Sequence, residues 1–341
     1  MSDSLDLKAE LQRSIDDKTK PLGALGRLED LALQLGLIQG TRSPRVEDAC
    51  IYVFAADHGI AREGVSAYPQ TVTRQMVQNF LAGGAAISVF AKLNGMQLRI
   101  VDAGVIEPCP AHALLVARRI GPGTRNFLHE PAMSAAQCDA ALRAGAELMA
   151  EARAAGTRVV GLGDMGIGNT SSASVLTSLT LGAPLERCVG RGAGLDDIGV
   201  RRKLDTLRRA VAARGTPPGA RERLQLFGGF EIAMLAGALA EAARQRTVIL
   251  VDGFIVCAAL AIACELEPRL LECCVFCHRS AEPGHDLLLE RFGAKPLLDL
   301  SMRLGEGSGA ALAYPLVRAA AAFLNDMATF ESAAVSRKSP P

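Results

Sequence analysis

The chain has 341 residues, 49% of them apolar, so it can bury a large core in two domains or in one large domain with an appendage. Its 37 lysines and arginines nearly balance its 36 aspartates and glutamates, which excludes a strongly charged surface for nucleic acid or an anionic membrane. The nine cysteines are scattered and odd in number, which argues against a disulfide scaffold.

Both ends of the chain show helical patterns without strands. The N-terminal pattern covers Leu5–Leu37, and the C-terminal pattern covers Gly309–Val335 and precedes a tail, Ser336–Pro341, that we expect to be disordered. We predict that residues 1–40 and 309–341 pair into a small helical domain, and that residues 41–308 form a large α/β domain that carries the active site.

The sequence predicts neither export nor a membrane span. Residues 1–20 are polar and mixed in charge, without the apolar stretch of a secretory signal. The longest apolar run, Phe254–Cys264, is shorter than the roughly 20 residues that span a bilayer. We therefore expect a soluble, cytoplasmic protein.

Between the two ends, short β-rich runs alternate with helical patterns. The predicted strands are Ala49–Ala56, Leu98–Asp102, Thr157–Leu162 and Thr247–Val251. The predicted helices are Pro69–Leu81, Ala85–Leu93, Ser134–Ala155, Thr170–Leu179, Asp196–Ala213 and Gly229–Gln245. This alternation predicts a doubly wound, mostly parallel, Rossmann-like sheet that binds its ligands beyond the carboxyl ends of its strands.

A glycine-rich segment with one carboxylate, Arg303–Ala311 (RLGEGSGAA), is the sharpest motif in the chain. Its glycines let the backbone approach a ligand closely, and the free N–H groups of the helix that follows can hold an anion. Glu306 stands among these glycines, where its carboxylate either contacts a substrate or caps the helix.

A second glycine-rich segment, Gly161–Thr170 (GLGDMGIGNT), follows a strand and opens a helix. It contains G-x-G-x-x-G, and Glu186 lies 20 residues past Gly166, which keeps open a dinucleotide-dependent oxidoreductase. Against that reading, Asp164 inside the turn would repel a pyrophosphate, and the Asn-Thr pair that ends the segment fits hydroxyl and phosphate contacts.

A third turn of this kind, Val189–Asp197 (VGRGAGLDD), leads into a helix that carries Lys203. Three such turns, together with a lysine in the helix after one of them, predict a phosphate site lined by backbone donors.

Two clusters invite a metal or haem interpretation. Asp57-His58 follows the first strand, where such a pair usually forms a hydrogen-bonded turn. The run Cys273–His278 contains C-x-x-C-H, and with Glu282 and His285 it can be drawn as a zinc site. Haem attachment needs export, and zinc needs a second well-spaced pair, so we expect buried thiols on an apolar strand and neither metal nor cofactor.

Taken together, these segments resemble the nicotinate-nucleotide–dimethylbenzimidazole phosphoribosyltransferase family, which prepares the lower ligand of cobalamin. The matching motifs occur in the family's order over nearly the whole chain and are Lys20–Glu29, Ala56–Gly59, Met165–Thr170, Gly228–Glu231, Asp252–Phe254, His278–Glu282 and Arg303–Ala311. The resemblance implies a six-stranded parallel sheet domain, a small domain from both chain ends and a homodimer. The implied reaction moves 5-phosphoribose from nicotinate mononucleotide to 5,6-dimethylbenzimidazole or a related base.

The resemblance also assigns residues to the site. Glu306 is the residue implied to remove the proton from the base. The residues expected to contact the substrates are Asp164, Gly166, Gly168, Asn169, Thr170, Gly190, Gly192, Lys203, Ser280, Arg303, Leu304, Gly305, Tyr68 and Met76. Of these, Tyr68 and Met76 are placed near the base pocket.

The chain departs from the family pattern at four positions. Asp164 stands where Glu is usual, Ser171 and Ala193 each replace a Thr, and Ala24 replaces a Ser. Three of these changes fall in the nucleotide-side loops, so they bear on substrate preference and efficiency more than on reaction class. They leave open a diverged paralogue that acts on a different base.

Overall fold

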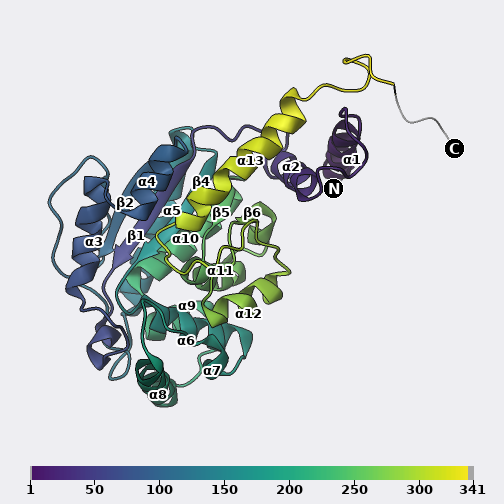
Figure 1. Ribbon diagram of the computed structural model, residues 1–341. Helices are drawn as coiled ribbons and strands as arrows, with labels where there is room; N and C mark the ends of the chain where they lie inside the picture. The colour runs from purple at the N-terminus through teal and green to yellow at the C-terminus, as the bar shows by residue number, and fades with distance from the viewer. Residues whose placement is uncertain (1, 337–341) are drawn as a thin grey trace.

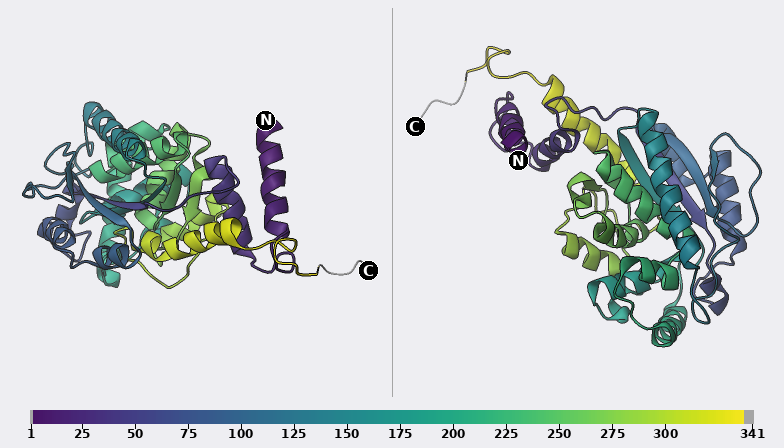
Figure 2. Two further views of the ribbon diagram at one scale, coloured as in Figure 1. Left: turned by 90° about the horizontal axis from the view of Figure 1, so that it is seen from above. Right: turned by 180° about the vertical axis from the view of Figure 1, so that it is seen from behind.

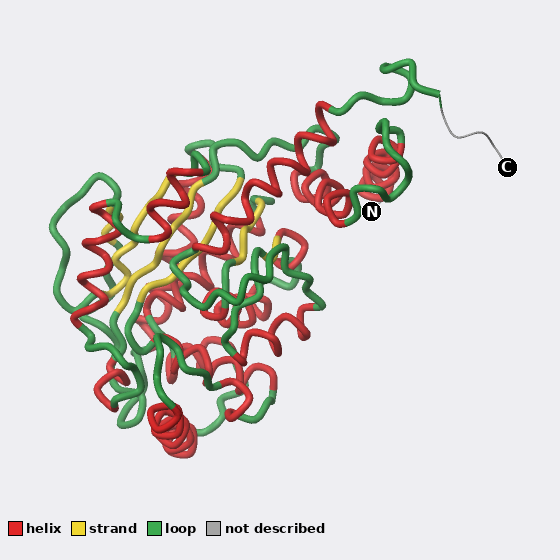
Figure 3. The backbone as a smooth tube through the Cα atoms, viewed as in Figure 1, coloured by secondary structure: helices red, strands yellow, loops and turns green. Residues whose placement is uncertain are grey.

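The computed structural model describes residues 2–336, and its centre is a six-stranded, all-parallel sheet in the order β3-β2-β1-β4-β5-β6. The strands are β1 (Cys50–Ala56), β2 (Gln97–Gly104), β3 (Leu115–Ala117), β4 (Val159–Met165), β5 (Val248–Val251) and β6 (Cys274–Phe276). Figure 3 shows these strands side by side, with helices on both faces. The order is that of a doubly wound sheet whose direction of winding changes between β1 and β4.

The four strands expected from the sequence all form, and the six-stranded parallel sheet implied by the family resemblance is confirmed. Residues in β1 and β5 are buried throughout, because helices cover both faces of the sheet. The two edge strands, β3 and β6, have only three residues each, which is too short for a pattern of apolar residues to identify them.

Helices cover both faces of the sheet. They are α1 (Ser2–Asp16), α2 (Arg27–Gln39), α3 (Thr71–Ala82), α4 (Ala86–Leu93), α5 (Ala135–Ala154), α6 (Asn169–Leu181), α7 (Leu185–Cys188), α8 (Asp197–Arg214), α9 (Ala220–Phe227), α10 (Phe230–Arg244), α11 (Phe254–Leu266), α12 (Pro283–Phe292) and α13 (Ser308–Asp326), with short 3₁₀ helices at Gly59–Glu63 and Leu270–Cys273. Helices α4 and α13 lie on one face, and α5 and α10 lie on the other (Figures 1 and 2).

Helix α10 lies between the sheet and α5, which explains why nearly all of its residues are buried. Two glycines permit this close packing. A Cβ on Gly145 of α5 would stand 1.9 Å from the Met234 carbonyl oxygen, and one on Gly237 of α10 would stand 2.0 Å from the Leu142 carbonyl oxygen. The high glycine and alanine content of the chain is therefore used, in part, to bring helices into backbone contact.

The helical N-terminal pattern consists of two helices, since α1 ends at Asp16 and α2 begins at Arg27. At the other end, the expected helix over Gly309–Val335 is too long, because α13 ends at Asp326. Beyond it, the hydroxyls of Thr329 and Ser332 each accept a hydrogen bond from the other residue's backbone N–H, a local arrangement that competes with the helix.

Helix α13 joins the two ends of the chain to the sheet. It packs on α2 as well as on α4, β4 and β5, and α1 packs on α2 (Figures 1 and 2). The division into a small domain of residues 1–40 and 309–341 and a large domain of residues 41–308 stays a prediction. The tail that we expect to be disordered is Ser336–Pro341, of which residues 337–341 lie outside the described residues.

Residues 71–93 are together long and apolar enough to resemble a membrane span. They form two helices, α3 and α4, which are separated by Gly83, Gly84 and Ala85 and pack on the strands of the sheet. About 33% of this apolar segment is buried in the structure, while Val89 and Leu93 of α4 are exposed.

Candidate active site

A cavity of about 120 Å³ lies beyond the carboxyl ends of β4, β5 and β6. It is lined by Asp164, Met165, Gly166, Ile167, Asn169, Thr170, Gly192, Ala193, Gly253, Phe254, Ile255, His278, Ser280, Glu282, Arg303, Leu304 and Gly305. The structure therefore brings together all three glycine-rich segments that the sequence singled out. Their position next to the point where the strand order reverses is where doubly wound sheets bind ligands.

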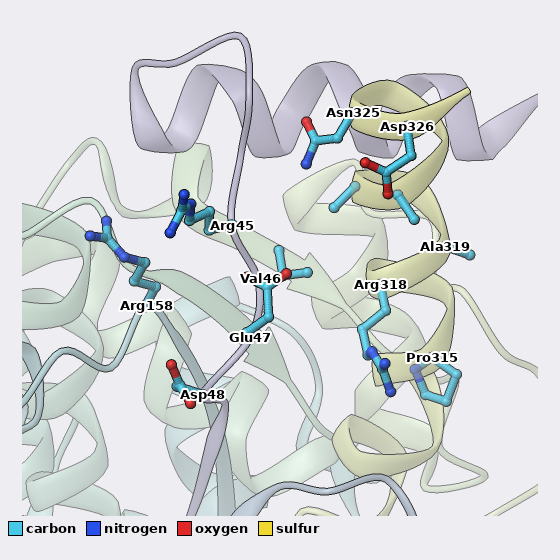
Figure 4. A pocket seen from close by; sticks show the side chains of 12 residues that line it. Arg45, Val46, Glu47, Asp48, Arg158, Pro315, Arg318, Ala319, Asn325 and Asp326 are labelled. Atoms are coloured by element: carbon cyan, nitrogen blue, oxygen red, sulfur yellow. The ribbon is translucent and has the colours of Figure 1, made fainter. Parts of the chain in front are cut away.

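A larger groove, of about 850 Å³, lies between α13 and the segment that precedes β1. Figure 4 shows the side chains that line it, among them Arg45, Asp48, Arg158 and Arg318. Asp48 precedes β1 and Arg158 precedes β4, so the groove lies at the amino ends of the strands, opposite the glycine-rich loops. We therefore place the chemistry in the smaller cavity.

Glu306 occupies a backbone turn that is unusual for a residue with a side chain. Its φ is 65°, and its neighbours Gly305 and Gly307 have φ values of 81° and 84°. Left-handed backbone is unfavourable for a residue with a Cβ, so such a conformation persists only where the surroundings hold it, and it is common at functional sites. The turn lies against β4, because Gly163 has no side chain to block its approach.

The Glu306 side chain is buried, with 4% of its surface exposed. Burial raises the pKa of its carboxyl to about 7, while a hydrogen bond from the backbone of Ile87 in α4 opposes the rise and the charge of Asp252 adds to it. Its Oε2 has no hydrogen-bond partner within residues 2–336. A carboxylate with a pKa near neutrality and a free oxygen is suited to accept a proton.

Asp164 is the next-to-last residue of β4, just before the loop that leads into α6. Its Oδ2 accepts a hydrogen bond of 2.8 Å from Nδ2 of Asn169. Burial first, and then the charges of Asp252 and Glu231, raise the pKa of Asp164 well above its usual value. Gly305 packs next to it, since a Cβ there would stand 3.2 Å from Oδ1 of Asp164.

Lys203, on α8, is fully buried behind the second and third glycine-rich segments. Its Nζ donates to the hydroxyl of Thr170 at 2.8 Å and to the carbonyl oxygen of Gly190 at 3.4 Å. Burial lowers the pKa of Lys203 to about 8, and the charge of Glu282 opposes that fall. The lysine thus links α6 to the third segment and places a cation directly behind the cavity.

Arg303 connects the first and third segments, because its Nη1 donates to the carbonyl oxygen of Gly192 at 2.7 Å. Leu304, beside it, is 56% exposed at the cavity margin. Gly192 has a φ of 53°, a conformation that favours glycine. These contacts bring backbone from two distant parts of the chain to one wall of the cavity.

Three residues at the cavity or beside it were not assigned a role from the sequence. His278 and Glu282 line the cavity with Ser280, and Asp252 lies behind them at the end of β5. Within the described chain, the two ring nitrogens of His278 and Oε2 of Glu282 have no hydrogen-bond partner. The signal in the sequence is that each of these residues follows a strand. Asp252 follows β5, and His278 and Glu282 follow β6, which is too short to be recognised from the sequence.

The Asp57-His58 turn is hydrogen-bonded, as expected. Oδ2 of Asp57 accepts from the backbone N–H of Ile106 at 2.8 Å. Nε2 of His58 is 2.6 Å from Oε1 of Glu231, and its Nδ1 is 3.1 Å from the hydroxyl of Ser172. His58 and Glu231 are both fully buried below the Gly166–Gly168 loop, so they support that loop rather than face the cavity.

The G-x-G-x-x-G pattern does not have the geometry of a dinucleotide-binding turn. Gly161 and Gly163 lie inside β4 rather than in the loop after it. Glu186, the acidic residue considered for a ribose, is on α7 and pairs with Arg208 at 2.6 Å on the surface. The glycines instead allow the approach of the Glu306 turn and of Ile51, which removes the basis for the oxidoreductase alternative.

Some of the expected residues lie beside the cavity rather than in its wall. Glu306 and Lys203 are two of them. Gly168 is the N-cap residue of α6, and Gly190 is in contact with Glu282. Tyr68, which is 52% exposed, and Met76, on α3, are not among the lining residues, and their role in base selection stays a prediction.

In the cysteine-rich run, Cys274 lies on β6 and is buried there. In the described part of the chain all cysteines are free thiols, and burial raises the pKa values of Cys274 and Cys277 well above the usual range. Within residues 2–336, no group of three or more His, Cys, Asp or Glu side chains is arranged to hold a metal ion.

Comparisons with known proteins agree on one family. The profile of a phosphoribosyltransferase family matches residues 2–335. The chain is 58% identical over 334 residues to the nicotinate-nucleotide–dimethylbenzimidazole phosphoribosyltransferase of Cupriavidus necator, covering 98% of this chain and 96% of that protein. It is 56% identical over 337 residues to the enzyme of the same name from Ralstonia nicotianae, covering 98% and 95%.

A solved structure gives the same result. The crystal structure of CobT from Thermus thermophilus superposes with a TM-score of 0.94 at 44% sequence identity, covering 98% of this chain and 100% of that one. The fold, the order of the motifs and the full-length similarity lead to one conclusion: the chain belongs to the nicotinate-nucleotide–dimethylbenzimidazole phosphoribosyltransferase family.

Proposed function

We propose that this protein transfers the 5-phosphoribosyl group of nicotinate mononucleotide to 5,6-dimethylbenzimidazole or a related base, for the nucleotide loop of cobalamin. The products are α-ribazole 5'-phosphate and nicotinate. The observation that carries the proposal is the buried carboxyl of Glu306, whose pKa is raised to about 7. Glu306 follows Gly305, which lines the cavity, and its carboxyl accepts a hydrogen bond from the backbone of Ile87 in α4.

The chemistry of the substrate explains why a single carboxylate is sufficient. In nicotinate mononucleotide the leaving group is a pyridinium cation, so the bond between its ring nitrogen and the ribose breaks without an acid or a metal. One nitrogen of the incoming base forms the new bond to the ribose carbon, and the other nitrogen loses its proton to Glu306. Attack from the face opposite the leaving pyridinium inverts the anomeric centre and gives the α-ribotide.

The other residues hold the nucleotide in this proposal. Lys203, Thr170 and the backbone of Gly192 form the phosphate side, where a buried lysine lies next to the N-terminus of α6. Asp164 and Asn169 face the ribose, on which positive charge develops as the pyridinium leaves. The base lies on the α3–α4 side of Glu306, near Met76. Holding both planar rings on opposite faces of one ribose contributes through orientation.

The test is incubation with nicotinate mononucleotide and a panel of bases, with the products read by mass spectrometry. The panel contains 5,6-dimethylbenzimidazole, benzimidazole, adenine and a phenol. The proposal predicts release of one nicotinate for each α-ribotide formed, with no added metal. Absence of nicotinate release with every base would contradict it. A preference for a base other than dimethylbenzimidazole would identify a diverged member of the family.

We further propose that the protein is a cytoplasmic homodimer. The support is the family resemblance. Sedimentation equilibrium tests the oligomeric state, and a monomer at assay concentration would contradict this part of the proposal without affecting the reaction.

A further inference from the structure

We infer that Asp252 is a positioning residue that holds the Glu306 turn in its reactive geometry. Asp252 follows β5 directly and is almost completely buried, with 1% of its surface exposed. No substrate contact is needed for this role, because its carboxylate faces the backbone that carries Glu306. The inference rests on the proposed role of Glu306 as the general base.

The carboxylate of Asp252 accepts three hydrogen bonds from the backbone just after Glu306. Its Oδ1 accepts from the N–H groups of Gly309 at 2.7 Å and Ala310 at 3.1 Å, and its Oδ2 accepts from that of Gly307 at 3.2 Å. The first turn of a helix has free N–H groups and a positive end, both of which an external carboxylate satisfies. The N-cap residue of α13, Gly307, has no side chain to do so.

The Glu306 turn needs such an external support. Three residues in a row have positive φ, and only the middle one, Glu306, has a side chain. Gly163 of β4 lies directly beneath the turn, so contacts with β4 fix one side of it. Asp252 fixes the other side from β5, the next strand in the sheet. The two strands therefore hold between them a turn that would otherwise relax.

Asp252 also affects the charge state of Glu306. The titratable side chains that face the turn are Asp164 from β4, Asp252 from β5 and His278 from β6, and α4 contributes the backbone N–H of Ile87. The charge of Asp252 contributes to the raised pKa of Glu306. Nε2 of His278 is 3.6 Å from Oδ1 of Asp252, and its ring packs on Gly309. Removing the Asp252 charge should therefore lower the pKa of Glu306.

The variant that tests the inference is Asp252→Asn, which preserves shape and one acceptor oxygen but removes the charge. We expect kcat to fall roughly 10- to 100-fold, because the general base is displaced, while KM for nicotinate mononucleotide changes little. The acidic limb of the kcat/KM profile should move to lower pH, because the charge that helps to raise the pKa of Glu306 is removed. A purely structural aspartate would lower stability but would leave this limb in place.

Asp102 provides a matched control. It lies in β2 near its carboxyl end, is buried, and accepts a hydrogen bond of 2.9 Å from the backbone N–H of Val105, whereas Asp252 accepts from the backbone that follows Glu306. Asp102→Asn should leave the pH limb in place. If Asp252→Asn does not fold, Asp252→Ser keeps an acceptor for Gly309 without the charge and allows the same comparison.

The outcomes separate this inference from the proposed function. An unchanged pH limb or an unchanged kcat in folded Asp252→Asn or Asp252→Ser overturns the role of Asp252. If Glu306→Gln retains full turnover, the proposed function of Glu306 fails instead. Loss of activity in Glu306→Gln together with an unmoved limb in Asp252→Asn rejects the inference alone.

Discussion

Gly163 of β4 lies directly against the backbone of Glu306: a Cβ on this glycine would stand 2.3 Å from the Glu306 carbonyl carbon. That distance is too short for any pair of carbon atoms that are not bonded, and backbone cannot rotate away as a side chain can. The glycine therefore determines how close the Glu306 turn comes to the sheet.

Gly163→Ala is accordingly expected to displace the Glu306 turn and to reduce kcat by about 100-fold, since small misplacements of a reacting group have effects of this size. Steady-state kinetics with saturating nicotinate mononucleotide measure the loss. Gly161→Ala is the control on the same face of the same strand, because its Cβ would meet the end of the flexible Ile51 side chain, at 2.1 Å from Cδ1. Equal kcat losses in both variants would contradict this explanation.

Lys203 should make the binding of nicotinate mononucleotide pH-dependent. Burial lowers its pKa to about 8, so the free enzyme loses this positive charge as the pH rises through 8. We expect KM for nicotinate mononucleotide to rise between about pH 7 and pH 9 in the unmodified enzyme. In Lys203→Met, KM should be high and nearly constant over the same range.

An exposed lysine, Lys295, provides the control for that measurement. Lys295→Met should keep both the KM and its pH dependence. A flat KM in the unmodified enzyme, or a normal pH dependence in Lys203→Met, would remove Lys203 from the phosphate site.

Asp164→Ala should raise KM for nicotinate mononucleotide or lower the rate with it, because the variant frees the Asn169 amide that Asp164 holds at 2.8 Å. If the two side chains act together, Asn169→Ala should have a similar effect, and the double variant should lose little more than either single one. Unchanged KM and rate in Asp164→Ala would make this carboxylate structural.

Glu306 also makes a prediction about stability. The pKa of its carboxyl in the folded protein, about 7, lies above the usual range of a glutamate, so the neutral form favours folding. That contribution is complete below the pKa of the unfolded chain and is lost as the pH rises through 7. Glu306→Gln, which stays neutral, should therefore gain stability over the unmodified protein at about pH 8.5 but not at about pH 4.

The gain should be on the order of 1–3 kcal/mol at the higher pH, measured by urea unfolding at both pH values. The exposed Glu290 provides the control, since Glu290→Gln should have the same small effect at both. A stability difference between Glu306→Gln and the unmodified protein that does not increase with pH would contradict the raised pKa.

The sequence predicted the glycine-rich loops because each follows a recognisable strand or precedes a helix. Asp164, Arg303 and Gly192 line one cavity as a consequence of the sheet order, which places β4 beside β5 and β5 beside β6. The family resemblance, rather than the pattern of residues, supplied the number of strands and the expected role of Glu306.

What could not be predicted from the sequence depends on contacts between distant segments. Helix α11 is apolar on every side, so it has no periodicity that would distinguish a buried helix from a strand. The proposed role of Asp252 rests on three hydrogen bonds to backbone that is distant in the sequence, and no local motif encodes them. The end of α13 was missed because side-chain hydrogen bonds at Thr329 and Ser332 outweigh helix propensity there.

The most direct test of Glu306 as the general base is the turnover of Glu306→Gln with nicotinate mononucleotide and 5,6-dimethylbenzimidazole, alongside nucleotide binding by the same variant. Glutamine keeps the shape of the side chain but cannot accept a proton at neutral pH. We predict that nucleotide affinity stays within a few-fold, and that turnover falls by roughly 100-fold or more. Turnover equal to that of the unmodified enzyme would show that another group removes the proton from the base.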